Sequence, residues 1–363
     1  MSPAATTTAG SAPAPLALYV HFPWCVAKCP YCDFNSFALR GELPVEPYLD
    51  ALQRDLDAQL EWFARAARDA PGAAGAPSLQ QRPITSVFMG GGTPSLFAPE
   101  AIGRWLEAAR VRLRFAPDCE ITLEANPGTV ERGRFADYRA AGVNRVSLGA
   151  QSFGAAQLAT LGRIHSAAET RAAATELHAA GLGNFNLDLM YALPGQTLAM
   201  ACADVRAALE LEPAHLSHYQ LTLEAGTTFA GLPPADLPDD DLTEAMLAEC
   251  LVLLEGRGFK RYEVSAYARA GARCRHNLGY WNFGDYLGVG AGAHGKLTLP
   301  AAGLPRILRT TRPREPRRYV ADPASLQVTE VAAAQRPFEF LLNALRLVDG
   351  FAVVDFEAST GLE

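Results

Sequence analysis

The sequence is short of long apolar runs, of cysteine and of excess basic charge, and each shortage excludes a class of protein. No apolar run approaches the roughly 18 residues that a membrane-spanning helix needs. Seven cysteines in 363 residues are too few for a disulfide scaffold. The chain has 32 basic and 39 acidic residues, so its net charge of −7 gives no reason to expect a nucleic-acid partner. The apolar set still makes up 49% of the residues, which is enough to form a folded core.

The first fifteen residues contain no charged side chain and consist of Met, Ser, Pro, Ala, Thr and Gly. A secretory signal would have a basic start and an apolar run of about 7 to 15 residues, and neither is found here. We therefore expect residues 1–15 to be a disordered tail on a cytoplasmic protein.

From Leu16 onward, short apolar segments alternate with amphipathic ones. The apolar segments are mostly too short for helices and predict strands at Leu16–Phe22, Ile84–Gly90, Cys119–Ala125, Arg145–Ala150, Asn184–Tyr191 and His215–Leu223. Helical patterns lie between and after them, at Val45–Ala67, Pro99–Leu113, Val130–Ala141, Ala167–Ala180, Leu198–Leu211 and Asp239–Arg257. Strand and helix in repeated succession predict an α/β fold with parallel strands, as either a barrel or a doubly wound sheet.

Polar residues and glycines gather where the predicted strands end, at Gly90–Thr93, Glu124–Asn126, Gln151 and Asp188. Both candidate folds place their functional sites at the carboxyl ends of the strands. We therefore expect these residues to share one site.

Three cysteines, Cys25, Cys29 and Cys32, follow the first strand in the spacing C-x3-C-x2-C. Three thiols within eight residues indicate a metal site in a reducing compartment. Structural zinc prefers four ligands, and neither a fourth cysteine nor an adjacent histidine follows. Three thiolates on a [4Fe–4S] cube leave one iron open to a small molecule. A cluster is thus the favoured interpretation, with zinc as the alternative.

This cysteine spacing resembles that of the radical S-adenosylmethionine (SAM) superfamily. The resemblance implies a [4Fe–4S] cluster on the three cysteines, with the amino and carboxylate groups of SAM on the fourth iron. It also implies reductive cleavage of SAM to methionine and a 5′-deoxyadenosyl radical. The implied fold is a partial (β/α)6 TIM-like barrel over residues 16–230, followed by a smaller α+β region over 231–348. Residues 349–363 are expected to begin a further small unit that is cut short.

Further motifs narrow the resemblance to the HemN/HemW family, which contains oxygen-independent coproporphyrinogen oxidases and haem chaperones. Residues Tyr19–Cys25 are similar to the family opening Y-x-H-x-P-F/W-C. Other matches follow in order at Gly90–Ser95, Glu124–Pro127, Gly149–Phe153, Gly162–Arg163 and Asn186–Tyr191. The resemblance extends over nearly the whole chain, from about Leu16 to Val348.

By this resemblance, a set of strand-end residues contacts SAM: Tyr19, Gly91, Gly92, Thr93, Glu124, Gln151, Arg163 and Asp188, with the backbone of Tyr31 beside them. Glycine lacks Cβ, so its backbone can approach the methionine amino group. The carboxylate of Glu124 can neutralise an ammonium group, whereas Gln151, Arg163 and Asp188 suit carboxylate and ribose hydroxyl groups. His21 lies next to the predicted cluster and is a candidate for tuning it and for a catalytic role.

Two positions distinguish the branches of the family. The oxidases tend to carry a fourth cysteine two residues after the third, where this chain has Phe34. The chaperone branch carries the motif H-N-x-x-Y-W, which is found here as His276, Asn277, Tyr280 and Trp281. An imidazole can ligate haem iron, and aromatic faces suit the macrocycle. The chaperone branch is favoured, and the alternative is the oxidase, whose substrate propionates the arginines of Arg306–Arg318 would bind.

The chaperone resemblance implies haem as cargo and apo-haemoproteins, such as respiratory enzymes, as its recipients. It further implies an electron donor such as flavodoxin or ferredoxin, a homodimer, and peripheral membrane contact through client proteins. A nucleic-acid partner is not expected.

Overall fold

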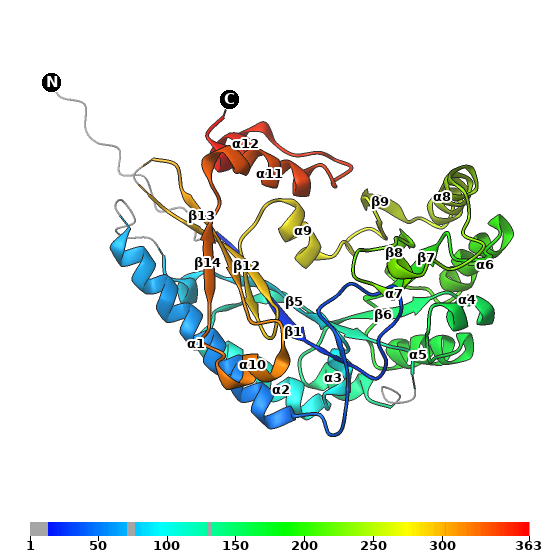
Figure 1. Cartoon of the computed structure of the whole chain (residues 1–363), viewed down its shortest axis with the longest axis horizontal. Coiled ribbons are helices and arrows are strands. Elements are labelled where there is room, and N and C mark those ends of the chain that lie inside the picture. Colours follow the sequence, from blue (N-terminus) through cyan, green and yellow to red (C-terminus); the bar gives the residue numbers. More distant parts are fainter. Residues whose placement is uncertain (1–13, 71–76, 129–132, 302, 363) are drawn as a thin grey trace.

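The computed structural model describes residues 14–70, 77–128, 133–301 and 303–362 (Figure 1). The predicted disordered tail therefore lies outside the described residues, except for Ala14 and Pro15. In the described part of the chain, no helix is long and apolar enough to cross a membrane.

Six parallel strands form the middle of a twelve-stranded sheet, and they correspond to the six strands predicted from the sequence. They are β1 (Leu16–Phe22), β4 (Ile84–Gly91), β5 (Phe115–Ala125), β6 (Arg145–Gln151), β7 (Phe185–Tyr191) and β8 (His215–Gln220). Their order in the sheet follows their order in the chain, whereas a doubly wound sheet reverses direction at its middle. The fold is therefore of the TIM-like type, and the sheet is open because β14 and β9 form its two edges.

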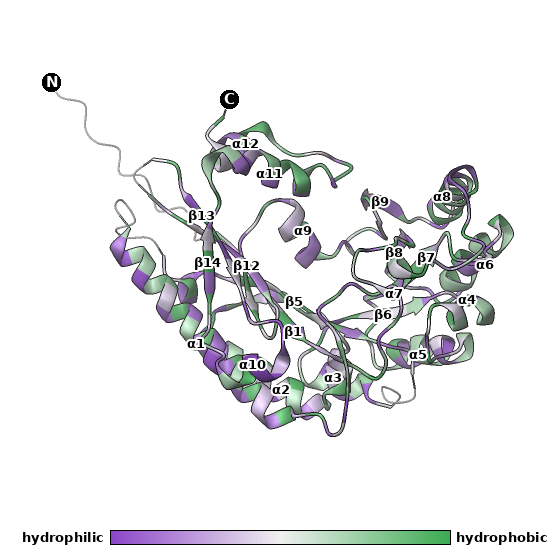
Figure 2. Ribbon diagram, in the orientation of Figure 1, coloured by the Kyte–Doolittle hydropathy of each residue, from purple (hydrophilic) through white to green (hydrophobic). Residues whose placement is uncertain are grey.

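Helices cover the convex outer side of the curved sheet, where α1, α2, α3 and α5 form an arc in Figure 1. The helices of this half are α1 (Val45–Asp69), α2 (Pro99–Arg112), α3 (Phe135–Ala140), α4 (Ala155–Thr160), α5 (Ala167–Ala179), α6 (Leu198–Leu209), α7 (Thr228–Gly231) and α8 (Asp240–Glu255). In Figure 2, α1 carries hydrophobic and hydrophilic residues alternately along its length, as an amphipathic helix does. The first residues of the helix predicted at Val130–Ala141 lie outside the described ranges.

Residues after 231 extend both edges of this sheet. On one side β10 (Ala266–Ala268) and β9 (Lys260–Glu263) follow β8, and on the other β11 (Tyr286–Val289) pairs with β1. The remaining elements are β12 (His294–Leu299), β13 (Arg306–Thr311), β14 (Gln327–Glu330), α9 (Arg275–Trp281), α10 (Pro316–Ala321), α11 (Arg336–Ala344), α12 (Val353–Thr360) and the short 3-10 turns η1 (Leu79–Gln81), η2 (Pro94–Leu96) and η3 (Ala333–Gln335). The division into domains at residues 230 and 348 stays a prediction.

Helix α9 lies at the amino-terminal end of the barrel strands. The chain reaches α9 from β10, whose Ala268 pairs with His215 at the start of β8. It leaves α9 into β11, whose Tyr286 pairs with Ala17 near the start of β1. In Figure 1, α9 and α11 accordingly lie at the opposite end of β12 and β13 from α10.

A buried carboxylate joins α1 to the C-terminal strands. The Oδ1 atom of Asp55 accepts a hydrogen bond from Nε of Arg312 (2.6 Å), and Oδ2 accepts bonds from Tyr319 and from the backbone N–H of Gly290. The Asp55 side chain is fully buried, and the Arg312 side chain is 1% exposed. Burial raises the pKa of Asp55, and the positive charge of Arg312 opposes that rise.

Replacement of Arg312 by Met is expected to lower the free energy of unfolding by about 3–5 kcal/mol, because the carboxylate of Asp55 would remain buried without its counter-ion. Urea denaturation measures the change. Arg306→Met is the matched control, since Arg306 forms an exposed ion pair with Glu330 and its removal should cost about 1 kcal/mol or less. Equal losses in the two variants would contradict a structural role for the buried pair.

Candidate functional site

The three clustered cysteines lie on a loop that leaves the carboxyl end of β1 and folds back on itself. Strand β2 (Trp24–Cys25) pairs with β3 (Phe37–Ala38), which closes the loop at its base. The backbone N–H of Leu39 also donates to the carbonyl of Cys25 (2.8 Å). Residues 25–38, which we call the cysteine loop, are thus held as a compact unit. Its three thiols are half-buried and unpaired in disulfides.

The surroundings of the cysteines fit a [4Fe–4S] cluster. Arg163 directs Nη1 at the sulfur of Cys29 (3.6 Å), and the Ser36 hydroxyl lies 3.6 Å from the sulfur of Cys32. Such donors stabilise cluster-bound thiolates. Among the described residues, no three Cys, His, Asp or Glu side chains converge on a point where a single ion would bind. In a cube each thiolate binds a different iron, so this donor set suits a cluster better than the alternative, zinc.

The other four cysteines, Cys119, Cys202, Cys250 and Cys274, are buried away from the loop. The first three lie in β5, α6 and α8, where they pack in the apolar core. Cys274 directly precedes α9, and its sulfur lies 3.7 Å from a carboxylate oxygen of Glu120.

The glycines after β4 bring its end against β1. A Cβ atom on Gly92 would lie 2.6 Å from the carbonyl oxygen of Trp24, and one on Gly91 would lie 2.3 Å from the His21 ring. Gly91 also has a φ of 107°, which favours glycine. The N–H groups of Gly92 and Thr93 donate to the carbonyls of Phe22 and Trp24. The glycines therefore allow the end of β4 to pack closely against the backbone just before the cysteine loop.

Glu124 and Asp188 place two carboxyl groups inside the barrel near this end. Burial raises the pKa of Glu124 to about 8, and the charge of Asp188 contributes to the rise. A hydrogen bond from the backbone N–H of Gly91 (3.0 Å) opposes it. Burial also raises the pKa of Asp188, whose oxygens accept bonds from Asn186 and Ser147. This acidic interior suits a cationic ligand such as SAM.

Gln151 and Arg163 complete the same end of the barrel. Gln151 has a φ of 66° although it is not glycine, and its side-chain oxygen accepts a hydrogen bond from Tyr219 (2.7 Å). Arg163 donates to the carbonyl of Gly149 and to Asn126. Within the described residues, Nε of Arg163 is buried without a hydrogen-bond partner. An unpartnered buried donor beside the carboxyl groups fits a ligand that carries an acceptor, as SAM does.

His21 and Tyr19 connect β1 to the cysteine loop. One ring nitrogen of His21 lies 2.9 Å from the Tyr19 hydroxyl, and the other lies 2.9 Å from the carbonyl of Asn35. Both nitrogens therefore have partners, and burial lowers the pKa of the ring. These contacts make His21 a residue that holds the loop, and its catalytic role stays a prediction. Tyr31 lies within the loop, beside Phe229 of α7.

The residues of the H-N-x-x-Y-W motif lie at the other end of the barrel. His276 is 1% exposed, and its ring nitrogens hydrogen-bond with the hydroxyls of Ser86 (3.0 Å) and Tyr280 (2.8 Å). Its ring stacks on Phe88 at 5.1 Å between centroids. Asn277, Tyr280 and Trp281 are half-buried on the same helix. Tyr19 lies between this motif and the cysteine end, because its ring centroid is 6.3 Å from that of His276 and 5.9 Å from that of His21.

Sequence reasoning missed Asn35, which helps to organise the site. Asn35 donates to the carbonyls of Ala291 and Arg314, and so it joins the cysteine loop to the C-terminal strands. Asn126, which the sequence placed in the shared site with Glu124, bonds both Thr93 and Arg163. Asn35 had no signal in the sequence, because its partners lie more than 250 residues away in the chain.

Comparison with known proteins identifies the relatives of this chain. The sequence profile of the Radical SAM superfamily matches residues 19–208. The heme chaperone HemW of Escherichia coli (strain K12) is 48% identical over 348 residues, which cover 96% of this chain and 87% of that protein. HemW of Haemophilus influenzae is 47% identical over the same shares of both chains. The coproporphyrinogen III oxidase HemN of Escherichia coli has a similar fold, with a TM-score of 0.77 and 22% identity over 97% of this chain and 80% of that one.

Replacement of Cys25, Cys29 or Cys32 by Ala is expected to abolish most cluster binding, because each thiolate holds one iron of the cube. Iron and sulfide counts after anaerobic reconstitution measure the loss. Cys202→Ala is the control, since Cys202 is buried in α6 and should leave the counts unchanged. Full iron content in any of the three loop variants would contradict the assignment of that cysteine.

Replacement of Glu124 by Gln is expected to stabilise the SAM-free protein and to weaken SAM binding by about tenfold or more. Between the ordinary pKa of a glutamate and about 8, the folded state keeps a proton on Glu124 that the unfolded state has lost. Its contribution to stability is therefore present at low pH and is lost as pH rises to about 8.

Urea denaturation from pH 5 to pH 9 should show the advantage of Glu124→Gln over the parent growing up to about pH 8 and then levelling. Equilibrium dialysis of the cluster-loaded protein measures SAM binding. Glu107→Gln, on an exposed position of α2, should change neither property. A stability difference that does not vary with pH would show that Glu124 does not carry the raised pKa.

Proposed function

The chain belongs to the HemW family of the radical SAM superfamily, and from this premise we propose that it binds haem and delivers it to apo-haemoproteins. A [4Fe–4S] cluster and SAM serve it as cofactors. The observation that carries the proposal is helix α9, which presents the motif H-N-x-x-Y-W at the end of the barrel opposite the cysteine loop.

Two properties of α9 support haem as the cargo. Burial lowers the pKa of His276 to about 3, so the ring is neutral, as a metal ligand must be. Aromatic side chains surround it, with Phe88 stacked on its ring and Tyr280 packed edge-on at 4.7 Å. The nitrogen that faces Tyr280 is buried with the ring, so iron would reach it only after this hydrogen bond is broken and Tyr280 moves aside.

At the cofactor end, Cys25, Cys29 and Cys32 would hold the cluster, which supplies an electron for SAM cleavage when both are bound. The carboxylate of Glu124 would bind the amino group of SAM, and Gln151 and Asp188 would orient its hydroxyl groups. Arg163 would stabilise the thiolate of Cys29 and, through Nε, donate to SAM. Asn126 keeps Arg163 in place through a hydrogen bond.

The partners follow from the same proposal. Reduction of the cluster requires an electron donor such as flavodoxin or ferredoxin. The chain would act in the cytoplasm as a homodimer and reach membranes through its client proteins.

Coproporphyrinogen oxidation is the alternative function, and the loop sequence does not favour it. Phe34 stands where the oxidase branch carries a fourth cysteine, and its side chain is 60% exposed. Conversion of coproporphyrinogen III by the cluster-loaded protein would overturn the chaperone proposal. We expect no conversion.

Replacement of His276 by Ala is expected to weaken hemin binding by about tenfold or more, because the iron would lose its protein ligand. Tyr280→Phe should instead tighten binding about fivefold, because the Tyr280 hydroxyl no longer competes for the imidazole. Titration followed by Soret absorption measures both affinities. His178→Ala, at an exposed site on α5, is the control.

Equal hemin affinities in His276→Ala and His178→Ala would remove His276 as the ligand but leave haem binding intact. A parent protein without any Soret change would instead contradict the proposed function itself.

A further inference from the structure

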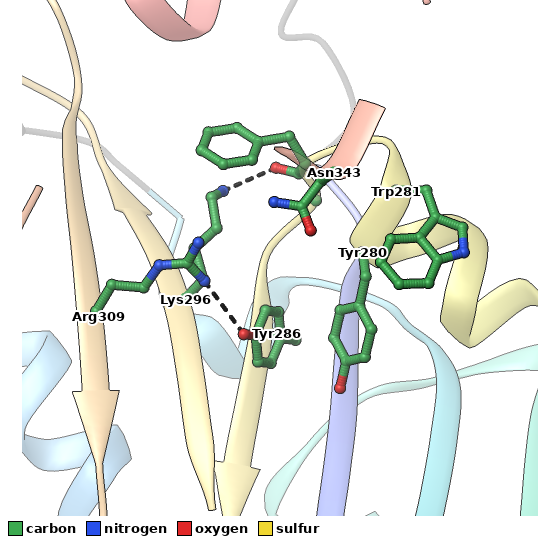
Figure 3. Close-up of a pocket in the computed structure, with 8 residues that line it drawn as sticks. Tyr280, Trp281, Tyr286, Lys296, Arg309 and Asn343 are labelled. Atoms are coloured by element: carbon green, nitrogen blue, oxygen red, sulfur yellow. Dashed lines mark hydrogen bonds between the residues drawn. The ribbon is translucent and has the colours of Figure 1, made fainter. Parts of the chain in front are cut away.

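A small cavity lies beside the H-N-x-x-Y-W motif, between the barrel and α11 (Figure 3). Its volume is about 120 Å³. Tyr280 and Trp281 of α9, Tyr286 of β11, Lys296 of β12, Arg309 of β13 and Asn343 of α11 line it. Small-molecule sites begin at about 300 Å³, so this cavity has room for one arm of a ligand but not for a whole macrocycle.

The charges around the cavity do not balance. Lys296 and Arg82 both bond the carboxylate of Asp285, at 3.0 and 2.9 Å, and all three side chains are at most 7% exposed. The two cations hold the pKa of Asp285 below its usual value although burial raises it. Arg309 has one carboxylate partner, Glu339. Three cations thus share two carboxylates, which leaves a net positive charge on this side of the cavity although each cation has a carboxylate partner.

Arg309 has more N–H donors than it has hydrogen-bond partners among the described residues. Its Nε and Nη2 atoms both donate to the same oxygen of Glu339. Its Nη1 atom donates to the Tyr286 hydroxyl, as Figure 3 shows. A guanidinium has five N–H donors, and the partners of Arg309 within the described residues accept from three of them. Lys296 has no such reserve, because Phe283, Asp285 and Thr298 occupy its three donors.

We propose that this cavity is a carboxylate subsite in which Arg309 binds one propionate arm of haem, with Lys296 supplying unbalanced positive charge. The inference rests on the proposed function, because it takes haem as the cargo. The subsite would give haem a second point of attachment, separated from His276 by Tyr280. Tyr280 bonds His276 through its hydroxyl and packs on Tyr286, a wall of the cavity, at 4.4 Å. A ligand that displaces Tyr280 from His276 would therefore also change this cavity.

The test compares hemin with hemin dimethyl ester, which keeps the iron and the ring but has no free carboxylate. Arg309→Met is expected to weaken hemin binding about tenfold, because one charge-assisted hydrogen bond is lost. Binding of the ester should be unchanged. Arg306→Met is the matched control on the same strand, and it should change neither affinity because Arg306 pairs with Glu330 outside the cavity.

Glu339→Gln is expected to increase the affinity for hemin, and a misfolded variant would not show such an increase. It removes the carboxylate that now occupies Arg309, so hemin should bind several-fold more tightly and the ester should not. Melting curves of each variant, recorded without ligand, show whether it is folded.

The outcomes separate the two proposals. Equal loss of hemin and ester binding in Arg309→Met, or no loss of either, would overturn the carboxylate subsite while the parent still binds haem. Absence of hemin and ester binding in the parent would overturn the chaperone function, and the subsite with it.

Discussion

The buried carboxylate of Asp55 is the interaction on which the rest of the structure depends. It holds Arg312, Tyr319 and the N–H of Gly290 against α1. Two turns earlier on the same helix, the Tyr48 hydroxyl donates to the carbonyl of His21 and accepts from the N–H of Ala291. Together these bonds fix β11 beside β1 at the point where the cysteine loop begins. Because Asn35 bonds the carbonyl of Ala291, the position of the loop also depends on this arrangement.

The barrel separates its two sites by placing them at opposite ends of the same strands. On β1, His21 faces the cysteine loop and Tyr19 lies deeper. On β4, Phe88 lies between Gly90 and Ser86, and the latter bonds His276. Contacts run without a break from His276 through Phe88 and Tyr19 to His21. These packed rings lie between the cysteine loop and α9, so the two ends of the barrel are connected by direct contacts.

The six parallel strands and the gathering of the strand-end residues could be predicted from the sequence, because both depend on local pattern and on the polarity of parallel strands. The position of His276 at the amino-terminal end of the barrel could not be predicted from such patterns. Strand β10 runs antiparallel to β8 and carries the chain back to the amino-terminal end, and three residues such as Ala266–Ala268 show no period that reveals their direction. The bonds of Asn35 and Asp55 were equally inaccessible, because their partners are distant in the chain and side-chain pairing leaves no periodic pattern.

The polar interior of the barrel explains why the apolar shell must be extensive. Arg145 and His215 are buried between the strands, and Glu124 and Asp188 are half-buried there. Removal from water raises the pKa of the two acids and lowers that of the histidine. Each such shift is a cost to folding at neutral pH. The main apolar cluster fills the space between the outer face of the sheet and the helices. There, Leu52, Leu56, Trp105 and Leu106 of α1 and α2 are buried against the sheet. Binding of SAM would offset part of this cost by pairing the two acids, so SAM should stabilise the fold as well as occupy its site.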